Sequence, residues 1–484
     1  MPSSNQTTYD LIVVGAGITG LSAAYTARKR FPGAKILLLE SDRRLGGKIL
    51  TDRVKTEAGD FIVEGGPDTF LATKPWGVAL CTELGLRERL HGTNPKQKNT
   101  YVLKKNRLLP LPDGLAMMIP TNIPSILRSG LVSWFSKARM GLDLIMPSAG
   151  KKAGEDESLG SFVSRRLGRE AYENLIEPLM SGIYAGDGDK LSLLSTFPYL
   201  RGLENKYGSL ARGALAMRPT KPSERQKTPG SRSAFLTPSS GLAEIIEALA
   251  AELDDIEIKL KCPVSQVAQT EGGFRLHFNG QTALTQRLIL ASPAWASSQM
   301  LADQPAELGS LAEVIGRVPY TATATVSIAY RESDLPRPLD GYGYVNPRAA
   351  GRKALAATWT STKFPHRAPS GFSLIRVFIG RAGEEAEIEW SETGLLKVAL
   401  EETREVMGIT AQPLFHRVFL WESAMPQYNL GHQQILVECQ DLQTRLPGFS
   451  LAGAGYRGIG IPDCINSAQQ AVEKVFTEKP MEEA

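Results

Sequence analysis

The chain has 484 residues, of which 42% are hydrophobic and 22% charged, and its formal net charge is +4. The length predicts two or three domains of ordinary globular composition, and the small net charge gives no ground for a nucleic-acid partner. The sequence has no apolar run of about 18 residues, no secretory signal and no Cys or His spacing typical of a metal site, which predicts a cytoplasmic protein without a membrane-spanning helix or a metal.

The first predicted element is a nucleotide-binding turn between an apolar strand, residues 9–14, and a helix, residues 21–30. Gly15 permits the turn, Gly17 lets the backbone approach a pyrophosphate, and Gly20 lets the helix pack on the strand. Free N–H groups at the positive helix end suit phosphates. The expected cofactor contacts of this turn are Gly15, Ala16, Gly17 and Gly20.

The strand at residues 34–39 ends in Glu40, where an acid is expected to bind a ribose hydroxyl. The loop after it offers a cation and free glycine N–H groups beside the first turn, although Gly46-Gly47 also favours a plain hairpin. The expected cofactor contacts here are Glu40, Ser41, Arg44, Gly46, Gly47 and Lys48. A further glycine turn, Gly66-Pro67-Asp68, is expected to lie against a flat ring.

The middle of the chain alternates between elements of different kinds. A hairpin is predicted over residues 101–111 with its turn at Lys105-Asn106. Residues 114–145 are rich in apolar clusters, and two interpretations stay open: the core of a helical domain, or a surface that rests on a bilayer. Residues 159–180 have helical periodicity, and residues 218–232 are expected to form a mobile surface loop.

The C-terminal stretch predicts a strand, a glycine turn and a helix from Asp463. Gly453, Gly455 and Gly458 repeat the nucleotide pattern and raise the alternative of an NAD site. No strand follows the helix, so the βαβ unit of such a site cannot be completed. We therefore expect the last strand to pair with the N-terminal sheet and the helix to point its positive end at a single FAD held from both ends of the chain.

No Ser/His/Asp arrangement stands out, and the five His residues are isolated in the sequence. The expected chemistry is hydride transfer to the flavin from a substrate that is only positioned, without a catalytic acid or base.

Taken together, the motifs resemble those of the oxygen-dependent protoporphyrinogen/coproporphyrinogen oxidases of the flavin monoamine-oxidase superfamily. The likeness covers nearly the whole chain. The residues that carry it are Gly15 to Gly20, Glu40, Arg44 to Lys48, Gly66 to Phe70, Glu177 to Asp187, Trp421 to Tyr428 and Gly458 to Ile465.

The resemblance implies oxidation of a porphyrinogen to its porphyrin in haem biosynthesis, with hydride transfer to FAD, reoxidation by dioxygen and release of hydrogen peroxide. It also implies an α/β fold: a discontinuous Rossmann-like FAD domain of the glutathione-reductase type at residues 1–75, 235–300 and 415–484, a helical insertion at 90–215 and a mixed-sheet substrate domain at 300–415. The helical domain is expected to be able to contact membranes. A second copy of the chain and the next enzyme of the haem pathway are the expected protein partners.

The resemblance also implies which residues contact the substrate and the cofactor. The backbone of Gly182 looks like the glycine that faces the tetrapyrrole N–H groups, and four apolar residues look like walls of the macrocycle site: Tyr344, Val345, Trp359 and Phe378. Val264 resembles the residue whose backbone meets adenine, and Trp421 the aromatic residue near the flavin. At the C-terminus, the expected cofactor contacts are Gly453, Gly460 and Ile461.

The sequence departs from the plant and animal members at Thr100, where they carry an arginine that pairs with a propionate. The Gram-positive-type members, whose substrate is coproporphyrinogen III, also lack this arginine, and the chain looks closest to them. The candidate substitute cations are Lys74, Lys96 and Lys98. Three other interpretations stay open: an amine oxidase, a carotenoid desaturase, and a non-enzymatic binding protein on the same fold.

Overall fold

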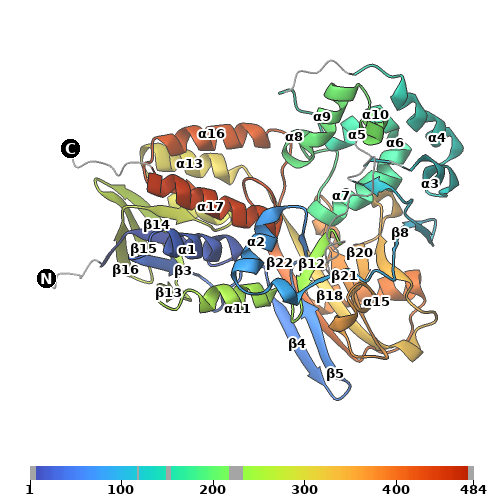
Figure 1. Cartoon of the computed structure of the whole chain (residues 1–484), viewed down its shortest axis with the longest axis horizontal. Helices are drawn as coiled ribbons and strands as arrows, with labels where there is room; N and C mark the ends of the chain where they lie inside the picture. Colours follow the sequence, from blue (N-terminus) through green and yellow to red (C-terminus); the bar gives the residue numbers. More distant parts are fainter. Residues whose placement is uncertain (1–6, 117–118, 121, 149–153, 217–232, 478–484) are drawn as a thin grey trace.

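The computed structural model describes residues 7–116, 119–120, 122–148, 154–216 and 233–477. The predicted surface loop at 218–232 and two methionines of the apolar stretch, Met117 and Met118, lie outside the described residues. The chain forms two sheet-based parts side by side, with a group of helices above the second of them (Figure 1).

The first part is built on a five-stranded parallel sheet in the order β13-β3-β2-β17-β23. Three of its strands are buried at every residue, because both faces of a parallel sheet are covered. The last strand pairs with β17, Leu288 opposite Phe449, so the predicted return of the C-terminus to the N-terminal sheet is confirmed. The strands are β2 (Leu11–Val14), β3 (Ile36–Leu39), β13 (Glu257–Lys259), β17 (Leu288–Leu290) and β23 (Phe449–Leu451).

Each face of this sheet has its own apolar core. One face packs against α1 (Ile18–Arg30), α11 (Ala243–Ala251) and α17 (Ile461–Thr477), and α1 and α17 lie against each other (Figure 1). The other face packs against a small second sheet and three helices. These elements are β14 (Val264–Thr270), β15 (Gly273–Phe278), β16 (Gln281–Thr285), α12 (Ala294–Leu301), α13 (Ala306–Gly316) and α16 (His432–Thr444).

The second part is a seven-stranded mixed sheet in the order β22-β18-β21-β20-β19-β8-β9, antiparallel except between β19 and β8. Helix α15 (Glu392–Met407) covers one of its faces. The hairpin of β4 (Thr51–Thr56) and β5 (Gly59–Glu64) covers one end of the other. The strands are β8 (Asn99–Lys104), β9 (Arg107–Pro110), β18 (Tyr320–Arg331), β19 (Gly341–Val345), β20 (Ala354–Trp359), β21 (Phe372–Ile379) and β22 (Phe415–Pro426).

The helical part has one core of its own. Its predicted helix over 159–180 is interrupted at Gly168, which has φ +95°, and by a π-helical turn at Tyr172–Ile176. The helices are α3 (Ile123–Arg128), α4 (Trp134–Gly141), α5 (Leu159–Leu167), α6 (Arg169–Ala171), α7 (Glu177–Tyr184), α8 (Leu193–Thr196), α9 (Pro198–Tyr207) and α10 (Leu210–Ala216). None of the helices traced in the structure is both long and apolar enough to cross a membrane.

Residues 114–145 contain both buried and exposed apolar side chains, and contact with a bilayer stays a prediction. The buried members of this stretch belong to the helical core: Ile119, Ile126, Leu131, Val132 and Met140. The exposed large apolar side chains among its described residues are Ile123, Leu127, Trp134, Phe135, Leu142, Leu144 and Ile145.

Strand pairing shifts two of the expected domain boundaries. The β8–β9 hairpin, with positive φ at Lys105 and Asn106 in its turn, lies in the seven-stranded sheet and not in the helical part. Strand β22, expected in the FAD domain, lies in the same sheet. The division into three domains itself stays a prediction.

Candidate functional site

The first glycine turn has the geometry that the three glycines predict. Gly15 has φ +96°, and a Cβ at Gly20 would lie 1.7 Å from the carbonyl oxygen of Gly15, so only glycine lets α1 pack this closely on β2. A Cβ at Gly17 would meet nothing within 4 Å. The missing side chain of Gly17 therefore leaves open space at the N-terminus of α1.

The N-terminus of α1 is suited to an anion. Its N-cap is Gly17, which makes no side-chain capping bond, and its first turn contains no acidic residue. The backbone N–H groups there and the helix dipole favour a phosphate. The next loop closes over this end: Gly46 donates its N–H to the carbonyl of Ala16 at 2.8 Å, and a Cβ at Gly47 would lie 3.2 Å from the Cα of Gly17.

The cations of that loop differ in their surroundings. The Arg44 guanidinium donates to the carbonyls of Leu45, Ile49 and Gly47, so it holds the loop together beside the turn. Lys48 points toward the start of α17, with its amine 6.0 Å from the Tyr320 ring, and burial lowers its pKa. Within the described part of the chain, no carboxylate pairs with Lys48.

Glu40 stands at the end of β3, where the sequence predicts it. Its Oε2 accepts from the N–H of Ala16 at 2.6 Å, and its Oε1 accepts from Ser41 Oγ at 3.2 Å. The segment that leads to Val264 passes beside it, because Cys262 donates its N–H to the carbonyl of Glu40 at 2.8 Å. Glu40, Ser41 and Val264 are therefore close together at one edge of the parallel sheet.

The C-terminal glycine turn meets the N-terminal one. Gly453 has φ +110°, and a Cβ there would lie 3.2 Å from Thr19 Oγ1 of α1. Gly460 accepts from the N–H of Cys464 in the first turn of α17, which begins at Ile461. Predicted contact residues from both ends of the chain thus lie near the adjacent N-termini of α1 and α17.

The third glycine turn, at residues 65–68, is hydrogen-bonded to side chains of the seven-stranded sheet. Thr325 Oγ1 and Trp421 Nε1 donate to the carbonyl of Gly65 at 3.0 and 2.9 Å, and Arg376 donates to the carbonyl of Gly66. Asp68 forms an ion pair with Lys363 at 3.0 Å. Burial would raise the pKa of Asp68, but Lys363 and Arg376 outweigh it and lower the pKa to about 2.

A small apolar wall continues the same face of the sheet beyond this turn. It consists of Ala185, Leu355 and Ala356, with Val345, Phe378 and Met425 packed against them. Val345 and Phe378 thus pack against the same cluster, and their contact with a macrocycle stays a prediction.

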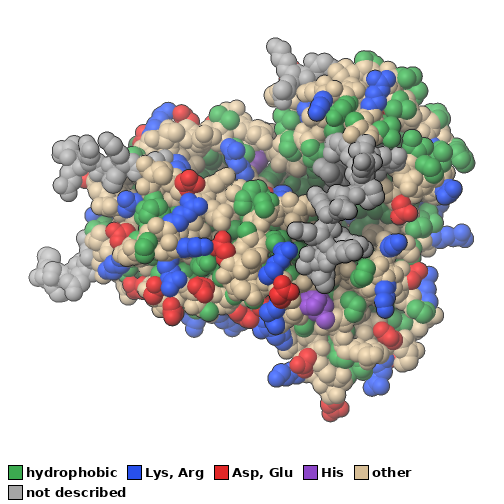
Figure 2. Space-filling view, in the orientation of Figure 1, with side chains coloured by type: hydrophobic (Ala, Val, Ile, Leu, Met, Phe, Trp, Pro, Cys, Tyr) green, Lys and Arg blue, Asp and Glu red, His purple; other side chains and the backbone are tan. Residues whose placement is uncertain are grey.

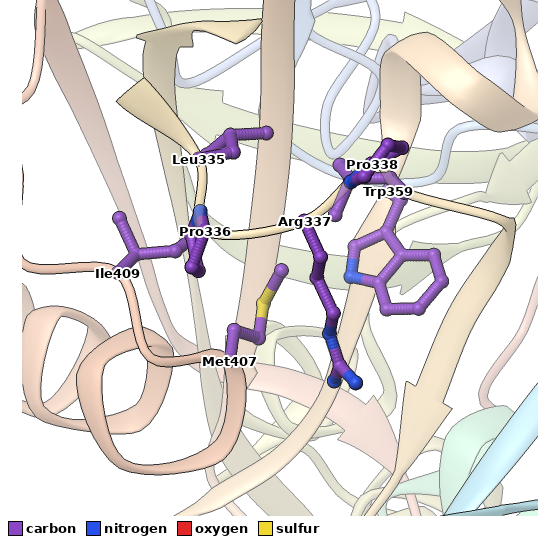
Figure 3. A pocket seen from close by; sticks show the side chains of 8 residues that line it. Leu335, Pro336, Arg337, Pro338, Trp359, Met407 and Ile409 are labelled. Carbon is purple, nitrogen blue, oxygen red and sulfur yellow. The ribbon is translucent and has the colours of Figure 1, made fainter. Parts of the chain in front are cut away.

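Two predicted wall residues point the other way. Tyr344 donates its hydroxyl to Glu402 of α15 at 3.0 Å, and Trp359 packs in the core beneath α15 with its ring centroid 5.7 Å from that of Tyr101. Figure 3 shows the Trp359 indole lining a pocket on this side with Met407. Tyr344 and Trp359, predicted to line the macrocycle, thus lie on the face of the sheet opposite to Val345 and Phe378, because side chains alternate along a strand and both have the parity of the α15 face.

The sequence reasoning missed the residues with the opposite parity. Arg376 is two positions before Phe378 in β21, so both side chains lie on the same face of the sheet. Thr358 of β20 pairs with Arg376 and lies on that face too. Ala185, Leu355, Ala356 and Met425 carry no such signal, because a bulge in β20 and contacts between distant segments bring them to the wall.

Gly182 lies on α7, and Ala185, the residue that follows this helix, belongs to the wall. A Cβ at Gly182 would meet nothing within 4 Å, so this glycine also leaves open space. Lys74 is not a free cation, because Asp463 in the first turn of α17 accepts from its amine at 2.6 Å with both carboxylate oxygens. Its contact with a substrate carboxylate stays a prediction.

These residues fit an extended dinucleotide with a flat ring. A helix N-terminus without a cap, open space at Gly17 and an unpaired Lys48 suit a pyrophosphate, and the Gly66 turn and the apolar wall follow at the next sheet. The described residues contain no group of three or more His, Cys, Asp or Glu side chains arranged to hold a metal ion.

Comparisons with known proteins agree with this fit. The model of the family described as flavin-containing amine oxidoreductase matches residues 18–476. The coproporphyrinogen III oxidase of Bacillus subtilis (strain 168) is 36% identical over 475 residues, which cover 96% of this chain and 98% of that protein. The coproporphyrinogen III oxidase of Staphylococcus aureus (strain NCTC 8325 / PS 47) is 32% identical, with coverage of 97% and 100%.

Solved structures give the same result. A protein from Exiguobacterium sp. 255-15, named as a candidate protoporphyrinogen oxidase, is 31% identical and superposes with a TM-score of 0.84 over 99% of this chain and 100% of that chain. The cyclohexylamine oxidase of Brevibacterium oxydans IH-35A shares the fold at 18% identity, with a TM-score of 0.67, 96% coverage of this chain and 98% of that one.

Proposed function

The chain belongs to the flavin-containing amine oxidoreductases and uses FAD, and on this premise we propose that it oxidises a porphyrinogen to the porphyrin with dioxygen as the final acceptor. Coproporphyrinogen III is the first candidate substrate and protoporphyrinogen IX the second. The observation that carries this proposal is the full-length similarity to coproporphyrinogen III oxidases, at 36% identity.

FAD, when bound, accepts hydride from the substrate and passes the electrons to dioxygen, which becomes hydrogen peroxide. The protein holds the cofactor through Gly17, Glu40 and Lys48 at one end and the Gly66 turn at the other. Val345, Phe378 and the small residues Ala185 and Ala356 form an apolar surface for a flat macrocycle. Water is kept from the reacting carbon by this surface, and no side chain is required to move a proton at it.

The test is porphyrin fluorescence, followed with coproporphyrinogen III and protoporphyrinogen IX side by side on the yellow holoenzyme. We expect oxygen-dependent porphyrin formation from at least one of them, with hydrogen peroxide as co-product. A holoenzyme with full flavin absorbance that is inactive on both substrates would contradict the proposal.

Gly182 tests the placement of the substrate. Gly182→Leu should raise KM for the porphyrinogen at least about tenfold, because its side chain would fill the open space at α7. A tenfold rise corresponds to a loss of about 1.4 kcal/mol of binding free energy. FAD content should stay unchanged. The matched control is Gly202→Leu on α9, where a Cβ also meets nothing within 4 Å. Equal KM values for both variants would place the substrate elsewhere.

The alternative functions differ in substrate or in the need for flavin. Amine oxidases and carotenoid desaturases share the flavin domain, so peroxide release should be measured with amines as well as porphyrinogens. A non-enzymatic binding protein does not need its cofactor, so a colourless purified protein would favour that reading.

The exposed apolar residues of the helical part support a peripheral contact with membranes. Trp134, Phe135 and Ile145 are 72%, 84% and 76% exposed, and hydrophobic side chains gather on this edge of the molecule (Figure 2). Lys137, 4.2 Å from the Trp134 ring, adds a cation for anionic lipid. In liposome flotation the native protein should rise with anionic vesicles and the W134S/F135S/I145S variant should not.

A second copy of the chain or the next enzyme of the haem pathway are the protein partners we propose. Sedimentation of the protein alone, and then with that enzyme, distinguishes them.

A further inference from the structure

Five charged side chains lie at the back of the glycine turn at residues 65–68: Glu64, Asp68, Lys363, Arg367 and Arg376. Two ion pairs account for four of them. Arg367 Nη1 lies 2.7 Å from Glu64 Oε1, and Lys363 Nζ lies 3.0 Å from Asp68 Oδ2. Three cations against two carboxylates leave this cluster with one uncompensated positive charge.

That charge belongs to Arg376. Its side chain is 2% exposed, and it donates one bond, to the carbonyl of Gly66. Its Nε and Nη1 are buried without a hydrogen-bond partner, and no carboxylate among residues 7–477 that the structure describes forms an ion pair with it. A buried, unpaired guanidinium is costly, and burial lowers the pKa of Arg376.

A second arginine of the same sheet shows the ordinary arrangement. Arg417 pairs with Ser327 from one side of β18, at the register where Arg376 pairs with Ser327 from the other. Arg417 is 40% exposed and forms an ion pair with Asp52 at 2.7 Å. The two arginines occupy one level of one sheet and differ in their ion pairs. Arg417 forms one with Asp52, whereas within the described residues no carboxylate forms one with Arg376, on which Asp68 and Glu64 act only from a longer distance.

The carbonyl that Arg376 binds belongs to the turn expected to lie against the flavin ring. The oxidised ring is neutral, and the reduced ring gains negative charge. A fixed positive charge behind the turn has little effect on the first form and attracts the second, and low local polarity strengthens this attraction.

We infer that Arg376 stabilises the negative charge of the reduced flavin and so raises the reduction potential of the bound cofactor. The inference depends on the flavin and not on the identity of the substrate, so it can be tested without a porphyrinogen.

The measurement is the midpoint potential of the holoenzyme, from anaerobic reductive titration against a reference dye, for Arg376→Met, Arg376→Lys and Arg417→Met. In Arg376→Met we expect the affinity for reduced FAD to fall about tenfold more than that for oxidised FAD, a shift of about 30 mV to more negative potential. Arg376→Lys keeps the charge and should lie close to the native value. Arg417→Met should match the native protein.

Two results would overturn the inference: a native potential in Arg376→Met, or equal shifts in the Met and Lys variants, which would indicate a role of shape and not of charge. A native potential with a raised KM for porphyrinogen would instead assign Arg376 to a substrate carboxylate. If Arg376→Met does not accumulate as a folded, yellow protein, the same comparison is made with Arg376→Gln, which retains a donor for the Gly66 carbonyl.

Discussion

Gly17 and Gly20 are three residues apart and act for opposite reasons. A side chain at Gly20 would collide with the backbone of Gly15, whereas a side chain at Gly17 would enter open space. Gly20 is therefore required by the fold, and Gly17 is free to be replaced unless a ligand occupies that space. This contrast separates cofactor binding from folding within one turn.

Gly17→Val should fold and lose FAD, because its branched side chain would take the place of the pyrophosphate. We expect the ratio of flavin absorbance to protein absorbance to drop to background while the far-UV circular dichroism stays native. Gly202→Val, on the exposed side of α9, should purify yellow. A fully yellow Gly17→Val protein would mean that the turn does not bind the cofactor.

His366 makes stability depend on pH. Burial, then Arg367 and His91, lower its pKa from 6.5 to about 4, so the folded protein binds this proton at a lower pH than the unfolded chain does. Its contribution to stability is present above pH 6.5 and is lost as the pH falls toward 4. In His366→Gln, the loss of unfolding free energy between pH 7.5 and pH 5 should be smaller by about 1–2 kcal/mol. Urea denaturation at both pH values measures this, and identical losses would contradict it.

At the scale of elements, strand parity decided which residues face the site. Tyr344 and Val345 are neighbours in β19, yet one packs under α15 and the other on the apolar wall. The motif alone does not show which face of its strand a side chain takes. A shift of one position moves a side chain to the opposite face of a sheet.

The helical part is held by buried ion pairs as well as by its core. Arg166 and Asp143 are both 0% exposed and form an ion pair between α5 and the segment after α4. The second carboxylate oxygen of Asp143 accepts from Ser209 Oγ at 2.6 Å and from the N–H of Ala211 at 2.8 Å. Asp143 thus connects three segments of the helical part.

Asp143→Ala should lower the free energy of unfolding by about 3–5 kcal/mol, because it removes the nearer carboxylate of a buried guanidinium, which keeps only Glu204 at 3.6 Å, and two further hydrogen bonds. Arg445→Met, which breaks the exposed pair with Asp441 at 2.8 Å, should change it by less than about 0.5 kcal/mol. Chemical denaturation of both variants gives the comparison. A cost for Asp143→Ala as small as that for Arg445→Met would show that the pair is solvated in solution.

At the scale of the whole molecule, the two ends of the chain pack together. Strand β23 and helix α17 complete a sheet that begins at β2, and α17 packs along α1 (Figure 1). The two helix N-termini can serve one cofactor only while this packing holds them together.

Ala468, which is 0% exposed in the core between α17 and α1, tests this dependence. Ala468→Leu should push the helices apart and weaken FAD retention during gel filtration, since overpacking costs about 1–3 kcal/mol. Gln470→Leu, on the exposed side of α17, should retain the cofactor. Full retention in both variants would mean that the site does not depend on α17.

The sequence by itself determined the nucleotide turn, the acid at the end of the second strand and the return of the C-terminal strand. The turn and the acid are local patterns whose backbone requirements are set by nearby residues, and the C-terminal strand was placed by its resemblance to such a pattern, so glycine spacing and apolar runs are enough to predict them. The hairpin at Lys105-Asn106 was predictable for the same reason.

Only the tertiary structure decided which side chains meet. The face chosen by Tyr344 and Trp359, the ion pair of Lys74 with Asp463 and the unpaired charge of Arg376 depend on which element covers each face of a sheet. Those contacts join residues that are tens to hundreds of positions apart. No local pattern records them, because burial and pairing are properties of the packed molecule and not of the segment.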